Sequence, residues 1–171
     1  MKAENIKVEY LREPIGIDIT EPRFSWTCTG GKKQSAYRIV AEINGNRVWD
    51  SGKVSSSAMT HIYYAGEKLK SFDHVDFKIC LWDEEDKEGE WSESFFEIGL
   101  LNKTDWKGKW ITGNYKADKK YRYPADYFRK EFTAGNEIKT ARLYIVACGL
   151  YEAYLNGTRI SDARFTPGCT D

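Results

Sequence analysis

The sequence predicts an all-β protein in which one complete β-sandwich, over residues 1–100, is followed by an incomplete second one, over residues 101–171. Three observations support this prediction. Aromatic residues are abundant, with 6 Trp, 11 Tyr and 8 Phe against 2 Met, and aromatic side chains favour strands. Apolar and polar residues alternate with the period of a strand. Two Asn-Gly pairs, which favour the tight turns of β-hairpins, each separate two such segments.

The first strands are predicted on either side of a glycine pair. Residues 9–19 contain a proline and a glycine and are expected to form an extended strap or a first edge strand, not a helix. The segment PRFSWTC follows as a strand, with Phe24, Trp26 and Cys28 on one face. The next segment, SAYRIVAEI, alternates in the same way and leads through Asn44-Gly45 into RVWDSG. Its inward residues are expected to be Tyr37, Ile39, Ala41 and Ile43.

The later strands complete a first sandwich. HIYYAGEKL is expected to form a strand that ends near Gly66. Residues 75–82 alternate, so that Val75, Phe77, Ile79 and Leu81 face the core. An acidic loop, DEEDKEGE, then leads to a last strand, WSESFFEIG. About seven strand-like segments in about a hundred residues are typical of an immunoglobulin-like β-sandwich.

The second region begins near Leu100, where Thr104-Asp105 resembles the cap of a short helical turn. The clearest feature is a hairpin in which Tyr151–Leu155 pairs with Thr158–Ile160 around Asn156-Gly157. Alternation in its first strand places Tyr151, Ala153 and Leu155 on the core face. Further strands are expected at 110–111, 127–132 and 138–148. About four strands are too few to complete a sandwich, so this domain is expected to be incomplete.

Composition excludes several classes of function. Lys plus Arg and Asp plus Glu number 26 each, so no net field attracts nucleic acid or an anionic membrane. No apolar run is long enough to span a membrane, and the first residues lack the apolar core of a signal peptide. We therefore expect a cytoplasmic protein without nucleic-acid or membrane partners, although a secreted parent protein is not excluded.

The four cysteines, Cys28, Cys80, Cys148 and Cys169, form no CxxC pair and no Cys/His cluster, which makes a zinc site improbable. A disulfide between Cys28 and Cys80 would resemble the pin of an immunoglobulin domain. Strand parity argues against it, because Cys28 faces the core and Cys80 faces away from it. Reduced thiols and no cofactor are the expectation.

Candidate catalytic residues are few. The acidic loop contains Glu84, Glu85, Asp86, Glu88 and Glu90, and glycoside hydrolysis requires two carboxylates in different environments. Crowded in one turn, these carboxylates are better explained as a solvated loop. The two histidines, His61 and His74, have no nucleophile motif near them, so no catalytic triad is indicated.

Exposed tyrosines are the weak candidates for substrate binding. The stretch 115–123 combines basic residues and tyrosines, but overall neutrality favours a loop over a nucleic-acid site. Tyr121, Tyr123 and Tyr154 are aromatic side chains that could stack on sugar rings. Aromatic residues in sandwiches more often lie in cores or interfaces. The sequons at 102–104 and 156–158 are attributed to coincidence, because no secretion signal accompanies them.

Eight blocks of the sequence, in order and with matching spacing, resemble the N-terminal region of bacterial α-L-rhamnosidases. They are GIDITEPRFSW, QSAYRIVA, VWDSGKV, WDEEDKEGEWSE, FEIGLL, DWKGKWI, YFRKEF and the final ARLYIVACGLYEAYLNGTRISDARFTPGCTD. The resemblance covers nearly the whole chain. It implies a fibronectin type III-like sandwich over residues 1–100, followed by the start of a jelly-roll-like sandwich.

The resemblance also implies what this chain lacks. In that family a large α/α barrel carries the glutamate acid and base that cleave terminal rhamnose with inversion, and the barrel lies after the second sandwich. Two departures from the family pattern stand out. Val75 and Phe77 replace an aromatic Tyr-x-Trp pattern, and Cys169 replaces a tryptophan of the closing motif. The first removes a tyrosine corner, and the second removes any contact of that indole.

The expected function is therefore that of a non-catalytic N-terminal piece of an α-L-rhamnosidase-like glycoside hydrolase. Its expected partner is the catalytic barrel of the same parent chain, with rhamnose-containing glycans as a further possibility. Three alternatives remain open: a stand-alone carbohydrate-binding module, an adhesion or protein-interaction module, and a small active glycosidase. The last is the weakest, because no acid/base pair can be named.

Overall fold

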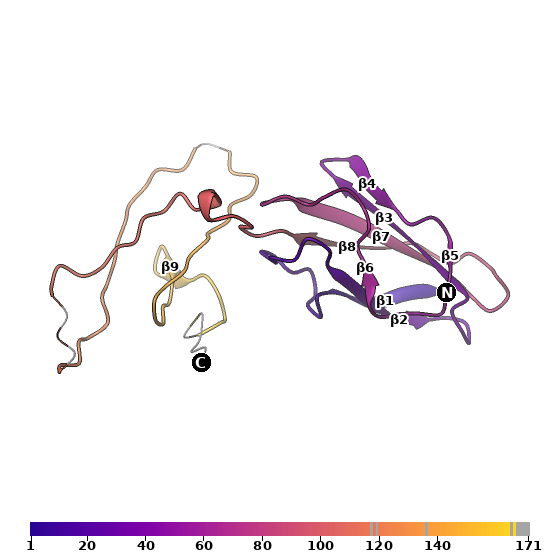
Figure 1. Ribbon diagram of the computed structural model, residues 1–171, viewed down its shortest axis with the longest axis horizontal. Coiled ribbons are helices and arrows are strands. Elements are labelled where there is room, and N and C mark those ends of the chain that lie inside the picture. The colour runs from indigo at the N-terminus through magenta and orange to yellow at the C-terminus, as the bar shows by residue number, and fades with distance from the viewer. Residues whose placement is uncertain (117, 119, 136, 165, 167–171) are drawn as a thin grey trace. The chain divides into compact units, whose positions relative to one another are not determined.

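The chain is described by a computed structural model over residues 1–116, 118, 120–135, 137–164 and 166. Contacts divide it into two compact units, Met1–Ile111 and Thr112–Asp171. The first unit contains nearly all of the regular secondary structure (Figure 1). The predicted all-β class is confirmed.

The first unit is a sandwich of two antiparallel sheets (Figure 1). One sheet has the order β1-β2-β6, and the other has the order β4-β3-β7-β8, with the short β5 also pairing with β3. The strands are β1 (Lys2–Val8), β2 (Arg23–Thr29), β3 (Ala36–Ile43), β4 (Asn46–Asp50), β5 (Val54–Ser55), β6 (Ile62–Tyr63), β7 (His74–Trp82) and β8 (Ser92–Glu97).

The core lies between the two sheets and follows the predicted alternation. In β7, Val75, Ile79 and Leu81 are fully buried and Phe77 nearly so. In β2, Phe24 and Trp26 are buried on the opposite wall. The alternation places the apolar side chains of each strand on one face. Because burial removes these side chains from water, the apolar faces of the two sheets pack against each other.

A second, smaller apolar cluster covers the outer face of the larger sheet. It consists of Ala36, Cys80 and Trp82, with Trp91 packed against it. Cations lie over its indole rings, since the Lys53 ammonium is 4.9 Å from the Trp82 ring centroid. Such cation–π contacts, about 0.5–1 kcal/mol each at exposed sites, explain how these tryptophans tolerate an outward position.

The cysteine parity prediction is confirmed. Cys28 packs beside the main core, whereas Cys80 belongs to the second cluster on the outer face of the other sheet. Both are free thiols, as is Cys148. Cys169, with the rest of the closing motif, lies outside the described residues.

The start of the sandwich differs from the expectation in part. Residues 9–22 form the strap that was one of the two alternatives, but the edge strand lies before it, at Lys2–Val8. This edge strand escaped prediction because most of its residues are polar. Only Ala3 and Val8 are buried, and the pairing with β2 is interrupted by a register shift between Glu4 and Lys7.

Both Asn-Gly turns are confirmed. Asn44 and Gly45 have φ of 52° and 76° between β3 and β4, and Asn156 and Gly157 have φ of 49° and 82°. The latter pair joins β9 (Tyr154–Leu155) to β10 (Thr158–Arg159). A type I′ turn needs positive φ at both central residues, which Asn and Gly tolerate best.

The second unit has far less strand than predicted. The segments 110–111, 127–132 and 138–148 are not strands among the described residues, and the hairpin is shorter than the predicted 151–160. Of its expected core face, Leu155 is 54% exposed, whereas Tyr151 and Ala153 are half-buried. The physical reason is that a strand needs a hydrogen-bonded neighbour and a surface to cover, and a lone hairpin is marginal in water.

The helical turn is correctly placed, but its cap is not. The turn η1 spans Lys103–Asp105, so Thr104 and Asp105 lie inside it and Asn102 is the N-cap. The Asp105 carboxylate accepts a hydrogen bond from the Asn102 backbone N–H at 2.9 Å, which supports the turn from its third residue.

A buried hydroxyl in the core allows a direct test of the packing. Tyr64 is 3% exposed, burial raises its pKa to about 12, and its hydroxyl has no hydrogen-bond partner among the described residues. We expect Tyr64→Phe to leave the free energy of unfolding unchanged or to raise it by up to about 1 kcal/mol, because an unpaired buried hydroxyl is costly.

The matched control is Tyr10→Phe. It removes a hydroxyl that accepts a hydrogen bond from Arg23 and contacts His61, so it should lower stability by about 0.5 kcal/mol. Urea unfolding followed by tryptophan fluorescence measures both variants. A Tyr64→Phe protein less stable than the Tyr10→Phe protein would contradict the prediction.

Candidate functional site

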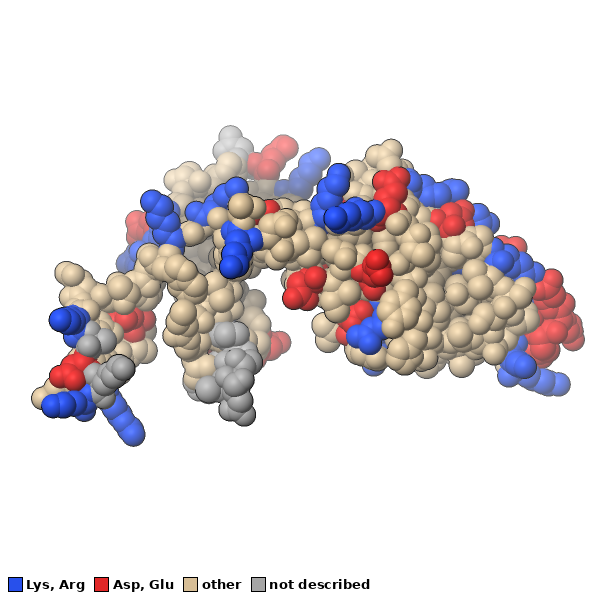
Figure 2. Space-filling view, viewed as in Figure 1, with Lys and Arg blue, Asp and Glu red and all other residues tan. Residues whose placement is uncertain are grey.

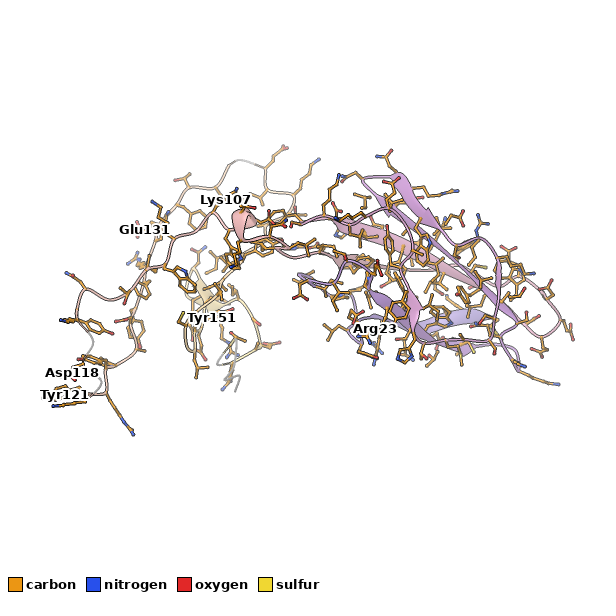
Figure 3. All side chains as sticks on the ribbon, viewed as in Figure 1. Arg23, Lys107, Asp118, Tyr121, Glu131 and Tyr151 are labelled. Carbon is orange, nitrogen blue, oxygen red and sulfur yellow. The ribbon has the colours of Figure 1, made fainter. Side chains whose placement is uncertain are left out.

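The predicted tyrosine candidates lie in two places of the second unit. Tyr121 and Tyr123 belong to one loop, and Tyr121 lies beside Asp118 at its tip (Figure 3). Tyr154 lies in β9. Tyr123 stacks on Tyr115 with ring centroids 4.8 Å apart, and its hydroxyl accepts a hydrogen bond from the Asp118 backbone N–H. The loop is thus closed by its own tyrosines.

Tyr154 makes a local contact of its own. Its hydroxyl donates a hydrogen bond to Glu152 at 2.7 Å, which raises its pKa, and its ring is 59% exposed. Tyr121 is also largely exposed, at 69%. The rings are accessible, but no hydrogen bond or ring contact among the described residues joins the three into one site. Sugar binding at these residues stays a prediction.

In the acidic loop, the Asp83 carboxylate supports the loop's own turn, and the Glu84 carboxylate binds the connection between β2 and β3. Figure 2 shows acidic side chains gathered at the tip of the sandwich, where the connection from β7 to β8 lies. Asp83 accepts backbone hydrogen bonds from Glu85 and Lys87, both at 3.0 Å, and Glu84 accepts them from Lys32 and Lys33. Backbone hydrogen bonds lower the pKa of both carboxyls. A general acid needs the opposite shift.

A cluster of polar side chains in the first unit, connected by hydrogen bonds, was not predicted from the sequence. It begins at a two-residue turn in which Glu9 and Tyr10 have φ of 48° and 65°. Val8 and Leu11 exchange both backbone hydrogen bonds across this turn, at 2.9 and 3.0 Å. Neither Glu nor Tyr tolerates left-handed backbone readily, and each such residue costs of order 1–3 kcal/mol.

An ion pair holds this turn in place. The Glu9 carboxylate accepts hydrogen bonds from the Arg23 backbone N–H at 2.7 Å and from the Arg23 guanidinium, Nε at 3.1 Å and Nη2 at 2.5 Å. The Glu9 side chain is only 8% exposed. The hydrogen bond from Arg23 lowers the pKa of Glu9. Arg23, labelled in Figure 3, therefore fixes the turn from β2.

The cluster continues to a histidine. The Arg23 guanidinium lies over the Tyr10 ring, 5.0 Å from its centroid, and donates to the Tyr10 hydroxyl at 3.3 Å. That hydroxyl is 3.4 Å from His61 Nε2. His61 itself has a φ of 57°, a third left-handed residue at the same place. We call Glu9, Tyr10, Arg23 and His61 the strap cluster.

His61 also lines a cleft of about 530 Å³ at one open side of the sandwich. Aromatic and hydroxyl-bearing side chains surround this cleft, among them Tyr37, Trp49, Ser51 and Tyr63. In the sequence, His61 is one of two histidines, and neither has a nucleophile motif near it. No local pattern could have revealed the cluster, because its members meet through the pairing of β2 with β6 and through a turn that lacks glycine.

Asp50, at the edge of the cleft, is neutralised within the fold. Arg38 donates two hydrogen bonds to its carboxylate, Nε at 2.9 Å and Nη2 at 2.7 Å, and Gly52 N–H donates a third at 3.0 Å. The hydrogen bonds from Arg38 are the main cause that lowers the pKa of Asp50 to about 2. Asp50 is thus an ion-paired structural residue, not a candidate acid.

A pH dependence follows from this pair. A carboxyl whose pKa is lowered by folding contributes stability above its ordinary value of 3.8, and that contribution disappears as the pH falls towards about 2. Because the pair is partly exposed, we expect Asp50→Asn to cost about 1 kcal/mol near neutral pH and less in acid. Urea titrations at neutral pH and at about pH 3 measure the difference, with the exposed Asp18→Asn as control. A cost that grows in acid would contradict the prediction.

No three His, Cys, Asp or Glu side chains gather into a metal-binding group among the described residues. The same part of the chain contains no helix that is long and apolar enough to cross a membrane. The described geometry therefore offers exposed tyrosines and a cleft whose lining carboxylate, Asp50, is paired with Arg38.

Comparison with known families assigns both units. Residues 3–102 match the family described as Rha78A-like, N-terminal immunoglobulin domain. Residues 136–171 match the α-L-rhamnosidase N-terminal domain. The first match covers the sandwich, and the second covers the hairpin region.

Curated relatives extend the comparison. An α-L-rhamnosidase of Formosa agariphila is 36% identical over 95% of this chain and 19% of its own length. One from Alteromonas sp. is 33% identical over 99% of this chain and 20% of its own length. The chain therefore spans about a fifth of these relatives.

Solved structures agree with the sequence relatives. The α-L-rhamnosidase of Streptomyces avermitilis, complexed with L-rhamnose, has a TM-score of 0.60 and 34% identity over 65% of this chain and 12% of that chain. The α-L-rhamnosidase from Dictyoglumus thermophilum has a TM-score of 0.60 and 35% identity over 64% of this chain and 14% of that chain.

The fold thus defines a β-sandwich module of the immunoglobulin class. The chain belongs to the Rha78A-like N-terminal immunoglobulin domain family and corresponds to the N-terminal segment of α-L-rhamnosidases. The predicted resemblance is confirmed.

Proposed function

We propose that this chain is the supporting N-terminal segment of a longer protein that hydrolyses terminal α-L-rhamnose residues, with the catalytic carboxylates outside the chain. The observation that carries the proposal is the family match combined with the share of the relatives that the chain spans, about a fifth. The lowered pKa values of Asp83 and Glu84 agree with a non-catalytic role for these two carboxyls.

Within the longer protein, the sandwich would act mechanically. A closed core of buried aromatic and aliphatic side chains makes it a rigid body, and rigid modules fix the orientation of neighbouring domains. Its proposed partner is a catalytic α/α barrel of the same polypeptide. A rhamnose-containing glycan as a direct partner of this segment is a second, separate proposal supported only by the exposed Tyr121, Tyr123 and Tyr154.

The compartment remains a proposal as well. Free thiols at Cys28, Cys80 and Cys148 support a reducing compartment such as the cytoplasm. Alkylation with and without prior reduction, on protein isolated from its native cells, tests this. Equal labelling of the thiols supports the proposal, and labelling that requires reduction would overturn it.

Reading the native gene beyond the codon for Asp171 tests the main proposal. We expect an open frame whose full product releases p-nitrophenol from p-nitrophenyl α-L-rhamnopyranoside, while residues 1–171 alone release none. Deletion of residues 1–111 from the full product should lower its thermal midpoint and its activity together. A stop codon directly after Asp171, or hydrolysis by the short chain, would overturn the proposal.

A further inference from the structure

The strap cluster carries backbone strain and touches the cleft through His61, which belongs to its lining. Three residues with side chains, Glu9, Tyr10 and His61, adopt left-handed backbone there, and they come from two separate segments of the chain. Such residues persist only when the surrounding structure holds them, and they gather at ligand sites. The Glu9–Arg23 ion pair stabilises the turn. Arg23 also donates to the Tyr10 hydroxyl, which in turn contacts the His61 ring.

The cleft itself presents aromatic surfaces with polar edges. Tyr63 is 56% exposed on β6, Tyr37 is half-buried on β3, and Trp49 is nearly buried between them and the core. The Tyr37 hydroxyl has an ordinary pKa of 10.0, which burial raises further, and it can donate a hydrogen bond at neutral pH. The contacts of the His61 nitrogens, 3.4 Å to Tyr10 and 3.2 Å to Thr60, are long enough for a ligand hydroxyl to replace.

The charges around the cleft decide the class of ligand. Asp50, which belongs to the lining, is already paired with Arg38 and Arg47. The described lining contains no other charged side chain. A charged ligand would lose its hydration without gaining a partner, whereas a neutral ligand loses little. The cleft thus favours a neutral molecule with an apolar face and hydroxyl edges.

We propose that this cleft binds a neutral, polyhydroxylated six-membered ring of monosaccharide size, with one ring face on Tyr63 and hydroxyls directed to His61 and Tyr37. The volume of about 530 Å³ lies within the range of small-molecule sites. This site is distinct from Tyr121, Tyr123 and Tyr154, which lie in the other unit. The inference does not depend on the hydrolase assignment of the longer protein.

Amide NMR shifts of the whole 171-residue chain test the proposal. Methyl α-L-rhamnopyranoside and methyl α-D-glucopyranoside are titrated separately, and the charged methyl glucuronoside serves as the matched ligand control. We expect saturable shifts centred on Ser51, His61 and Tyr63 with at least one neutral ring, and weaker binding of the charged one. No saturable shift with either neutral ring, or shifts centred on residues 112–171, would overturn the proposal.

Two variants locate the site. Tyr63→Ala removes an exposed ring that the core does not need and should weaken binding about tenfold, which corresponds to the loss of one ring contact. Tyr121→Ala removes a ring elsewhere that is 69% exposed, against 56% for Tyr63, and should leave binding unchanged. A dispersed amide spectrum confirms that each variant is folded. Equal binding by the wild type and Tyr63→Ala would exclude the proposed stacking.

Discussion

Phe24→Ala is expected to destabilise the sandwich by about 3–5 kcal/mol, the largest effect of any single truncation considered. The Phe24 side chain is fully buried, and its ring lies 4.9 Å from the Phe77 ring centroid and 6.0 Å from that of Phe96. It also contacts Trp49 at 5.7 Å. The ring therefore joins both sheets, and its removal leaves a cavity that rigid neighbours cannot close.

The matched control is Phe72→Ala in the same sandwich. Phe72 is 51% exposed, so the same truncation should cost less than about 1 kcal/mol. Thermal unfolding and urea unfolding measure both. Because a small domain is stable by only about 5–15 kcal/mol, Phe24→Ala should lower the unfolding midpoint substantially. Similar midpoints for the two variants would show that Phe24 is not at the centre of the core.

The sequence predicted the sandwich well because its core strands satisfy two requirements at once. In β7 the alternation of Val75, Phe77, Ile79 and Leu81 fixes the buried face, and Asn44-Gly45 fixes the register of β3 and β4. In these strands, the face that the alternation predicts to be buried is also the face that packs in the core. The sequence is therefore sufficient to predict them.

The edge strand β1 shows where pattern fails. Its sequence, KAENIKV, buries only two side chains, and its place is set by pairing with β2 and by hydrogen bonds such as that from Ser92 to the Ala3 carbonyl at 2.7 Å. These partners lie far away in the sequence. A strand held mainly by backbone pairing leaves little periodic signal.

In the second unit the strand prediction fails for the opposite reason. Its apolar alternation, as in residues 141–147, is that of a strand, but the described residues offer it no neighbouring strand to pair with. Ile145 and Val146 are 42% and 47% exposed. A segment with high strand propensity becomes a strand when it pairs with a neighbour. The hairpin at Asn156-Gly157 forms because its two strands are adjacent in the sequence and need no distant partner.

The strap cluster could not be predicted from the sequence at all. A two-residue turn with positive φ normally carries Asn or Gly, and here Glu9 and Tyr10 occupy it. The turn exists because Glu9 binds both the backbone and the guanidinium of Arg23. Long-range electrostatics overrides local preference at this position. Where it does so, the strain itself is the sign of a constrained site.

Glu9→Gln is consequently expected to cost about 2 kcal/mol, the second largest effect, because it removes a nearly buried charge from four hydrogen bonds with Arg23. The control is Glu131→Gln, whose ion pair with Arg129 has side chains 81% and 85% exposed and should contribute less than about 0.5 kcal/mol. Urea unfolding compares the two variants, and equal costs would contradict the prediction.

The stability lost in Glu9→Gln should depend on pH, and the strained turn between Val8 and Leu11 should open more easily. Since the pKa of Glu9 is lowered by Arg23, its contribution is present above the ordinary value of 4.5 and disappears as the pH falls below it. The double variant Glu9→Gln with Arg23→Met isolates the pair by a mutant cycle. If the ion pair holds the strained turn, Glu9→Gln should also speed amide exchange at Leu11, which donates across the turn to Val8. Unchanged exchange at Leu11 would mean that the turn keeps its left-handed backbone without the charge, and the source of its stability would then have to lie in the hydrogen bond from the Glu9 backbone N–H to the Arg23 carbonyl.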